Sequence, residues 1–256
     1  VPIGAPIIWG EANPGFSRLT LDVDTDAQGW MVLSLPNTSN GDQLFAYPVT
    51  TTAPVPDGVD VITGPNSQRL EDVTWASGRF TATLHDGRAP LAVRAAQLDV
   101  TGSRLTPIPA STGGAFFVQG AVASNGSVTL RVDSCSGGPA RRISPTGTLL
   151  DPVGTYLPFS GDTCALGSDG TGFLAVNGPG GNLRGVRIAD DNTLLDSSTF
   201  PISTASGIQW PAAVAFGGGN YVVVSTEIRS TTGRDVYAAR VSPAGVARDP
   251  GGIVIA

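Results

Sequence analysis

Short runs of alternating apolar and polar residues fill most of the chain, separated by turns rich in Gly, Asn and Asp. Residues 210–256 show the pattern most clearly, with three apolar runs, a short final run, and Gly-rich or polar turns between them. A two-residue period places successive side chains on opposite faces of a strand. No segment sustains the 3.6-residue apolar period of a helix. The pattern therefore predicts an all-β protein.

Two positions recur in phase along the chain, at an interval of about 48 residues that is typical of repeat proteins. The first is an aromatic or β-branched residue that opens a second strand: Trp30, Phe80, Val128, Phe173 and Tyr221. The second is an apolar residue of a third strand: Val49, Leu98, Ile143, Ile188 and Val241. Two landmarks in phase predict a five-bladed β-propeller of four-stranded antiparallel blades. A β-sandwich is the alternative, although a sandwich does not require in-phase repeats.

The repeats divide a single domain, residues 1–256, into blades. We expect these blades at residues 16–63, 70–109, 116–159, 162–202 and 210–256. Residues 1–15 are expected to close the ring, with Pro6 to Trp9 forming a strand against the fifth blade, because propellers protect open edges by joining their ends. The fifth unit carries a fourth strand of its own, so the closing strand would be an additional outer strand.

The fifth unit contains PAAVAFGGGNYVVVS and DVYAARVSPAG, and the fourth contains GSDGTGFLAV and GVRIADDN. These segments resemble the repeats of large secreted and lipid-anchored bacterial surface proteins, whose pattern is PxVAFDGTNYLVVW followed by DIYGARVSPDG. Ser225 replaces the Trp of that pattern, and the first three units match it only in outline. The resemblance implies a propeller with an extracellular location, and it supplies no catalytic residues.

The composition excludes several functional classes. All 15 basic residues are arginine, which excludes a phosphate-loop lysine and a Schiff-base lysine. The formal net charge of −6 opposes binding to nucleic acid or anionic lipid. No apolar run reaches the about 18 residues of a membrane helix, so we expect no membrane insertion. The chain begins at Val1, so we expect a secreted or cell-surface protein whose export signal has been removed.

The connections between second and third strands vary among the units, whereas the other turns are short and alike. We call the end of the ring that carries them the loop edge; its variable connections are residues 35–43, 85–91, 133–139, 177–182 and 226–235. Function usually lies on variable loops held by a rigid scaffold. Cys135 and Cys164 are expected at this edge in adjacent blades, which predicts a disulfide in an exported protein. A free catalytic cysteine is the alternative.

An acidic run in the first unit is the one candidate metal site. Asp22, Asp24 and Asp26 have the alternating spacing of a calcium-binding loop and resemble the cages of integrin-like propellers. The glycine and the closing carboxylate of such a loop are replaced by Ala27 and Trp30. Ordinary turn chemistry is therefore the alternative. No other cofactor is expected.

The only histidine, His85, lies beside Asp86 and Arg88 in a variable connection. With no Gly-x-Ser-x-Gly elbow and no further zinc ligands, it supports neither a catalytic triad nor a zinc site. These residues are candidates for ligand contact, and a solvated loop is the alternative. Glu227 and Arg229 occupy the equivalent place in the fifth unit, which predicts acid–arginine pairs that hold the loops.

Carboxylates and tryptophans are the remaining candidates. Glycoside hydrolysis needs two carboxyl groups about 5–10 Å apart, and Glu71 with Asp72 lies near the start of an inner strand that borders the axis. Trp210 precedes the inner strand of the fifth unit at the loop edge, where an amphipathic ring can stack on a sugar. Packing in the core is the alternative for Trp210.

These residues favour an extracellular, non-enzymatic recognition or adhesion module that binds a glycan or a protein partner through its loop edge. A glycosidase-like hydrolase with an axial carboxylate pocket is the second hypothesis. A structural spacer within a larger surface protein is the third.

Overall fold

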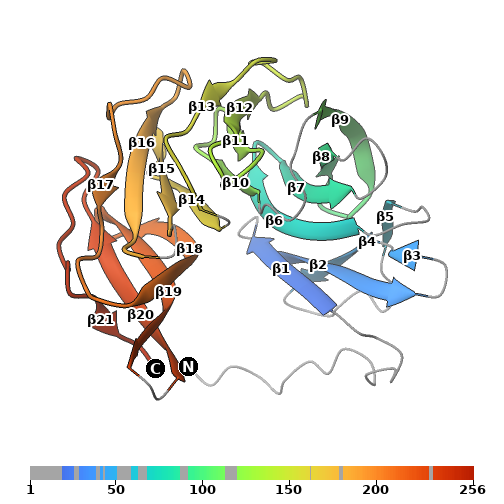
Figure 1. The fold of residues 1–256 in the computed structure, drawn as a ribbon. Helices are drawn as coiled ribbons and strands as arrows, with labels where there is room; N and C mark the ends of the chain where they lie inside the picture. The colour runs from blue at the N-terminus through green and yellow to red at the C-terminus, as the bar shows by residue number, and fades with distance from the viewer. Residues whose placement is uncertain are drawn as a thin grey trace.

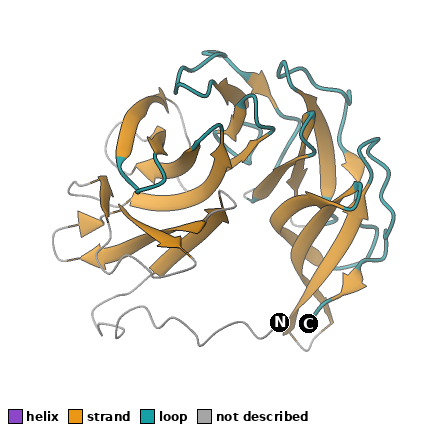
Figure 2. Ribbon diagram, turned by 180° about the vertical axis from the view of Figure 1, so that it is seen from behind, coloured by secondary structure: helices purple, strands orange, loops and turns teal. Residues whose placement is uncertain are grey.

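The structure is a computed structural model that describes residues 19–25, 29–38, 41–42, 44–50, 59–62, 68–86, 92–112, 120–161, 163–178, 181–230 and 233–256. All regular elements in these residues are β-strands, arranged in five antiparallel sheets. The sheets follow one another around a centre in chain order (Figure 1), and the view from behind shows no helix in the described chain (Figure 2). The chain is an all-β, five-bladed β-propeller, as predicted, and the sandwich alternative is wrong.

Each blade runs from an inner strand outward in chain order. The inner strands are β1 (Leu19–Thr25), β6 (Gln68–Ala76), β10 (Ala121–Ser124), β14 (Cys164–Ser168) and β18 (Ile208–Gly217). The second strands are β2 (Gly29–Thr38), β7 (Arg79–Asp86), β11 (Thr129–Val132), β15 (Gly172–Asn177) and β19 (Asn220–Ser230). Successive inner strands contact each other from β1 through β18.

The third strands are β4 (Leu44–Thr50), β8 (Ala92–Leu98), β12 (Pro139–Ile143), β16 (Arg184–Ala189) and β20 (Gly233–Val241). The outer strands are β5 (Val59–Ile62), β9 (Arg104–Thr112), β13 (Thr155–Tyr156), β17 (Phe200–Pro201) and β21 (Ile253–Val254), and β3 (Gly41–Asp42) pairs with β2. The fifth blade thus has its own outer strand. The predicted closing strand in residues 1–15 lies outside the described residues.

Tight hairpins join the first and second strands of the second and fifth blades. Ser77 and Gly78 both have positive φ, 50° and 80°, between the paired residues Ala76 and Arg79. Two central residues with positive φ form the turn type whose twist matches that of antiparallel strands. The fifth blade uses a Gly-Gly pair at residues 218–219 for the same purpose. Such turns explain why a glycine-containing turn segment recurs in the sequence about once per repeat.

The landmark positions of the second and third strands lie opposite each other in four blades: Trp30 and Val49, Phe80 and Leu98, Phe173 and Ile188, Tyr221 and Val241. In the third blade Ile143 lies opposite Thr129, so Val128 was the wrong landmark. The cause is the hairpin. Asn125 accepts hydrogen bonds from the backbone N–H groups of Ser127 and Val128, which makes Val128 the last turn residue.

Apolar side chains fill the spaces between the last three blades. Phe173 of the fourth blade and Leu130 of the third share one buried core. Tyr221 of the fifth blade and Leu174 of the fourth share the next. The second-strand landmark therefore faces the preceding blade in both cases. Full burial of each Phe or Leu side chain stabilises the fold by about 1.5–3 kcal/mol.

A repeated ion pair connects neighbouring blades at the end of the ring opposite the loop edge. In three blades a third-strand arginine binds an aspartate nine residues later through Nε and Nη2: Arg142 with Asp151, Arg187 with Asp196, and Arg240 with Asp249. The remaining Nη1 of Arg142 donates to the carbonyl of Asp190 at 3.2 Å, and that of Arg187 to Pro243 at 3.2 Å. Both carbonyls belong to the next blade. These two pairs therefore link the third blade to the fourth and the fourth blade to the fifth.

Candidate functional site

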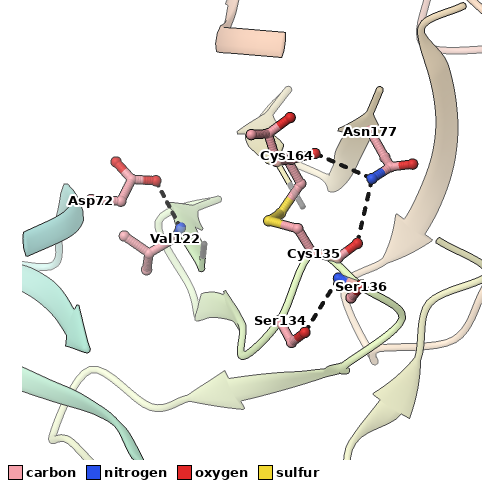
Figure 3. Close-up of a disulfide and its surroundings, with 8 residues drawn as sticks. Asp72, Val122, Ser134, Cys135, Ser136, Cys164 and Asn177 are labelled. Carbon is pink, nitrogen blue, oxygen red and sulfur yellow. Dashed lines mark hydrogen bonds between the residues drawn. A yellow bond between two sulfur atoms is a disulfide. The ribbon is translucent and has the colours of Figure 1, made fainter. Parts of the chain in front are cut away.

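The loop edge is fixed by a disulfide between adjacent blades. Cys135 lies in the variable connection of the third blade, and Cys164 begins β14 of the fourth. The two residues form the predicted disulfide, with Cα atoms 5.2 Å apart, and both are buried (Figure 3). Beside it, the Asn177 side-chain amide donates to the carbonyl of Cys135 at 3.4 Å. The variable loop of the third blade is thus joined covalently to the start of the next inner strand.

A buried charged cluster, which the sequence did not predict as a site, holds the start of the same loop. Arg131 of β11 is fully buried, with Nε 2.7 Å from Oδ1 of Asp133, and Asp133 also pairs with Arg141 of β12. Burial lowers the pKa of Arg131 to about 10, so the guanidinium stays charged at neutral pH. The equivalent paired positions of the fourth blade are the buried residues Ala175 and Val186. Removing one member of a buried ion pair leaves an uncompensated charge, so loss of Arg131 or Asp133 should destabilise this part of the blade.

Asp72 links two inner strands. Its Oδ2 accepts a hydrogen bond from the backbone N–H of Val122 in β10 at 2.8 Å (Figure 3). Its Oδ1 accepts one from the backbone N–H of Val73 at 2.9 Å. Glu71 lies at a β-bulge between Leu70 and Asp72, where the register with β7 shifts by one residue. The hydrogen bond to Val122 therefore holds the Asp72 carboxylate at the contact between the second and third blades.

The register relates Asp72 to an aspartate in the first blade. Asp22 and Asp72 each lie opposite the residue three places after the second-strand landmark, namely Leu33 and Thr83. In the other three blades this position holds alanine: Ala121, Ala165 and Ala213. Because β1 and β6 contact each other, the two aspartates lie on adjacent inner strands at matching positions.

The calcium prediction concerned a loop, but β1 continues through Thr25. Asp22 and Asp24 therefore lie within the strand, opposite Leu33 and Met31. Asp26 lies outside the described residues. No group of three or more His, Cys, Asp or Glu residues suited to a metal ion occurs in the described part of the chain.

The candidate residues of the second blade lie on a strand, where a loop was expected. His85 and Asp86 are the last two residues of β7, opposite Arg69 and Gln68 of β6. They lie at the loop edge, because β7 ends there. Arg88 lies outside the described residues.

The predicted acid–arginine pair of the fifth blade is confirmed. The buried carboxylate of Glu227 accepts a hydrogen bond from Arg229 Nε at 2.5 Å and another from the Ser225 hydroxyl at 2.7 Å. Arg229 also donates to the carbonyl of Gly251 at 2.7 Å and lies 3.6 Å from the ring centroid of Tyr237. Glu227 belongs to the second strand and not to an inner strand, so its carboxylate holds the loop edge together and does not line the axis.

Trp210 is the third residue of the fifth inner strand, so it lies inside β18 and not before it as expected. It is partly buried at the loop edge, opposite Thr226 of β19. The exposed guanidinium of Arg234, at the start of β20, lies 4.6 Å from the centroid of the indole ring. Arg234 was not predicted, because the contact joins two strands that are separated by β19. Together the two side chains form a partly exposed aromatic and cationic surface.

No family model and no curated protein matches the chain. Among solved structures, a GH43_1 enzyme from Xanthomonas citri is similar with a TM-score of 0.50 and 9% identity, covering 98% of this chain and 93% of that one. The GH43_1 enzyme from Xanthomonas citri complexed with xylose has a TM-score of 0.49 and 10% identity, and the match covers 98% of this chain and 92% of that one. Its complex with xylotriose has a TM-score of 0.49 and 10% identity, and the match covers 91% of this chain and 90% of that one. At 9% identity the similarity to the first of these structures concerns the fold alone.

Proposed function

We propose that this propeller is an extracellular protein that binds a saccharide at its loop edge, with Trp210 as the stacking platform. The single observation that carries the proposal is the position of Trp210. A partly buried indole lies at the start of an inner strand, on the edge with the variable loops. Aromatic rings with one packed and one wet side suit the apolar face of a sugar ring. The fold supports the proposal only by analogy, since a GH43_1 enzyme is built on it.

The extracellular location is part of the proposal. A buried disulfide between blades persists in an oxidising compartment and is rare in the cytosol. The repeat resemblance points to bacterial surface proteins. Binding through an aromatic platform requires no cofactor, and calcium at Asp22, Asp24 and Asp26 stays a prediction. No helix long and apolar enough to cross a membrane occurs in the described residues.

Glycoside hydrolysis is the second candidate, and the comparison with a GH43_1 enzyme favours it over a purely adhesive function. The supporting observation is the distribution of carboxylates. The inner strands β10, β14 and β18 contain no Asp or Glu, whereas the contacting strands β1 and β6 contain all of them: Asp22, Asp24, Glu71 and Asp72. Hydrolysis requires such a pair of carboxyl groups. Asp72→Asn and Asp22→Asn would each abolish cleavage of a bound glycan if these residues perform it.

The binding proposal is tested by a saccharide panel and by two matched variants. Trp210→Ala removes the platform, whereas Phe216→Ala removes an exposed aromatic ring from the opposite end of the same strand. We expect the parent to bind at least one saccharide, Trp210→Ala to bind it at least about tenfold more weakly, and Phe216→Ala to bind it normally. A folded parent that binds no saccharide refutes the proposal and leaves a protein partner as the ligand of this edge.

A further inference from the structure

We propose that Arg234 makes this edge selective for saccharides that carry a carboxylate, namely uronic acids. The inference rests on the proposed function and adds the class of ligand. It concerns the surface formed by Trp210 and Arg234, which we call the Trp210–Arg234 surface. The carboxylate of the sugar would bind the guanidinium, which lies over the indole, while the sugar ring contacts the part of the indole that the guanidinium leaves uncovered.

The charge of Arg234 is not neutralised by the described residues. In the described part of the chain, other arginines pair with a carboxylate, among them Arg131, Arg141, Arg142, Arg187, Arg229 and Arg240. Among the described side chains, none forms an ion pair with Arg234. The neighbouring carboxylate of Asp235 does not pair with Arg234, because successive residues of a strand point to opposite faces. The exposed side chain therefore presents a positive charge in a chain whose net charge is −6.

The stacked position leaves the guanidinium able to bind a ligand. The distance of 4.6 Å to the ring centroid lies within the range of cation–π contacts, which use the face of the guanidinium. The five N–H donors lie in the plane of the group, so stacking does not consume them. A carboxylate accepts two parallel hydrogen bonds from this planar donor set. The indole also restrains the arginine side chain, which reduces the entropy that binding would otherwise cost.

The site lies where a saccharide can reach it. Trp210 is the third residue of an inner strand and Arg234 the second residue of a third strand, and both positions belong to the loop edge. Arg234 is exposed and its guanidinium lies over the ring of the partly buried Trp210, so an approaching ligand meets the cation first. A ligand with a planar or slightly curved apolar face and an anionic substituent at its rim matches this arrangement.

The test compares ligands of the same size and different charge. Trigalacturonate carries carboxylates, its methyl ester is neutral, and xylotriose is a neutral trisaccharide without the substituent. The parent protein is titrated calorimetrically with each. We expect trigalacturonate to bind at least about fivefold more tightly than its methyl ester, a modest ratio because the pair is exposed to solvent. Raising the salt concentration should reduce that ratio through screening.

Two arginine substitutions in the same blade separate a local contact from a general charge effect. Arg234→Gln should reduce the ratio to about one while the affinity for the methyl ester changes by less than about twofold. Arg248→Gln makes the same charge change at an exposed residue of the opposite edge, and it should preserve the ratio. Arg234→Lys should preserve only part of it, because an ammonium group does not bind a carboxylate in the bidentate geometry.

Three results overturn the inference. In the first, the parent binds trigalacturonate and its ester equally while Trp210→Ala weakens both, so saccharide binding stands and charge selectivity fails. In the second, Arg248→Gln lowers the ratio as much as Arg234→Gln, which indicates a long-range charge effect. In the third, none of the three saccharides and no member of the panel binds, so the proposed function fails as well.

Discussion

Removal of the disulfide between Cys135 and Cys164 should destabilise the protein strongly. The two residues are separated by 29 positions in the chain, and the cross-link closes a loop of that length in the unfolded state. On the chain-entropy relation, closing such a loop is worth about 3–4 kcal/mol at 25 °C. Both side chains are buried, so the double variant Cys135→Ala/Cys164→Ala avoids burying a polar hydroxyl in their place. We expect it to lose stability of this size.

The assay is urea unfolding of the parent and the double variant, with and without reductant. For a slope of about 2–3 kcal/mol per molar urea, the midpoint should fall by about 1–2 M. Reductant should lower the midpoint of the parent by a similar amount and leave the double variant unchanged. The reasoning is refuted if the double variant unfolds at the same urea concentration as the parent, or if the unreduced parent reacts as two free thiols.

Three further predictions follow from the blade contacts and the sequence. A hydrogen bond from Arg142 lowers the pKa of Asp151, so the stability from this pair is present above the carboxyl's unfolded pKa, near 4, and is lost as the pH falls through the lower folded value. Asp151→Asn should therefore reduce the free energy of unfolding at pH 7 by about 1 kcal/mol, which lowers the melting temperature, and should have little effect at pH 2. Equal losses of stability at the two pH values would contradict this. Deletion of residues 1–10 should destabilise the ring and promote association, measured by thermal melting and gel filtration, and a truncated protein that melts like the parent as a monomer would exclude a closing role. Millimolar calcium should change the melting temperature little, and a large increase that disappears in Asp24→Ala would show a complete calcium site.

The blade architecture could be predicted because the local sequence pattern of each strand and turn agrees with its place in the overall fold. Gly-rich hairpins, β-branched strands and the paired landmarks recur in phase, and the register places four of the five landmark pairs opposite each other. The third blade misled because Val128 is β-branched and precedes Thr129. The hydrogen-bonded turn supplies the missing signal, since Asn125 and Asp169 bind their turns in the same way.

The interactions between blades were less predictable, because they depend on how separate strands face each other. Arg142 directly precedes the landmark residue Ile143, but its partner Asp151 lies nine residues away across a turn. The recurrence of an arginine followed nine residues later by an aspartate in three units is the signal that finds this pair. Arg131 offers no such signal, because its burial follows only from the packing of one blade on another.

The candidate site was predicted in part. Trp210 was identified from its place at the loop edge, and the pair of Glu227 and Arg229 from its spacing of two residues along one strand face. Arg234 was missed, because its contact with Trp210 crosses a blade between nonadjacent strands. Such contacts require the strand register, which the sequence pattern does not specify.

The most direct test of saccharide binding at the loop edge is the response of the Trp210 side chain to ligand. The chain has four tryptophans, so a ¹H–¹⁵N correlation spectrum should contain four indole N–H signals, and the one missing in Trp210→Phe belongs to Trp210. Addition of a saccharide that the parent binds should shift this signal in a saturable way, with a dissociation constant equal to the calorimetric value. If the saccharide binds and the Trp210 signal stays unchanged while another indole signal shifts, the binding site lies elsewhere and the central claim is wrong.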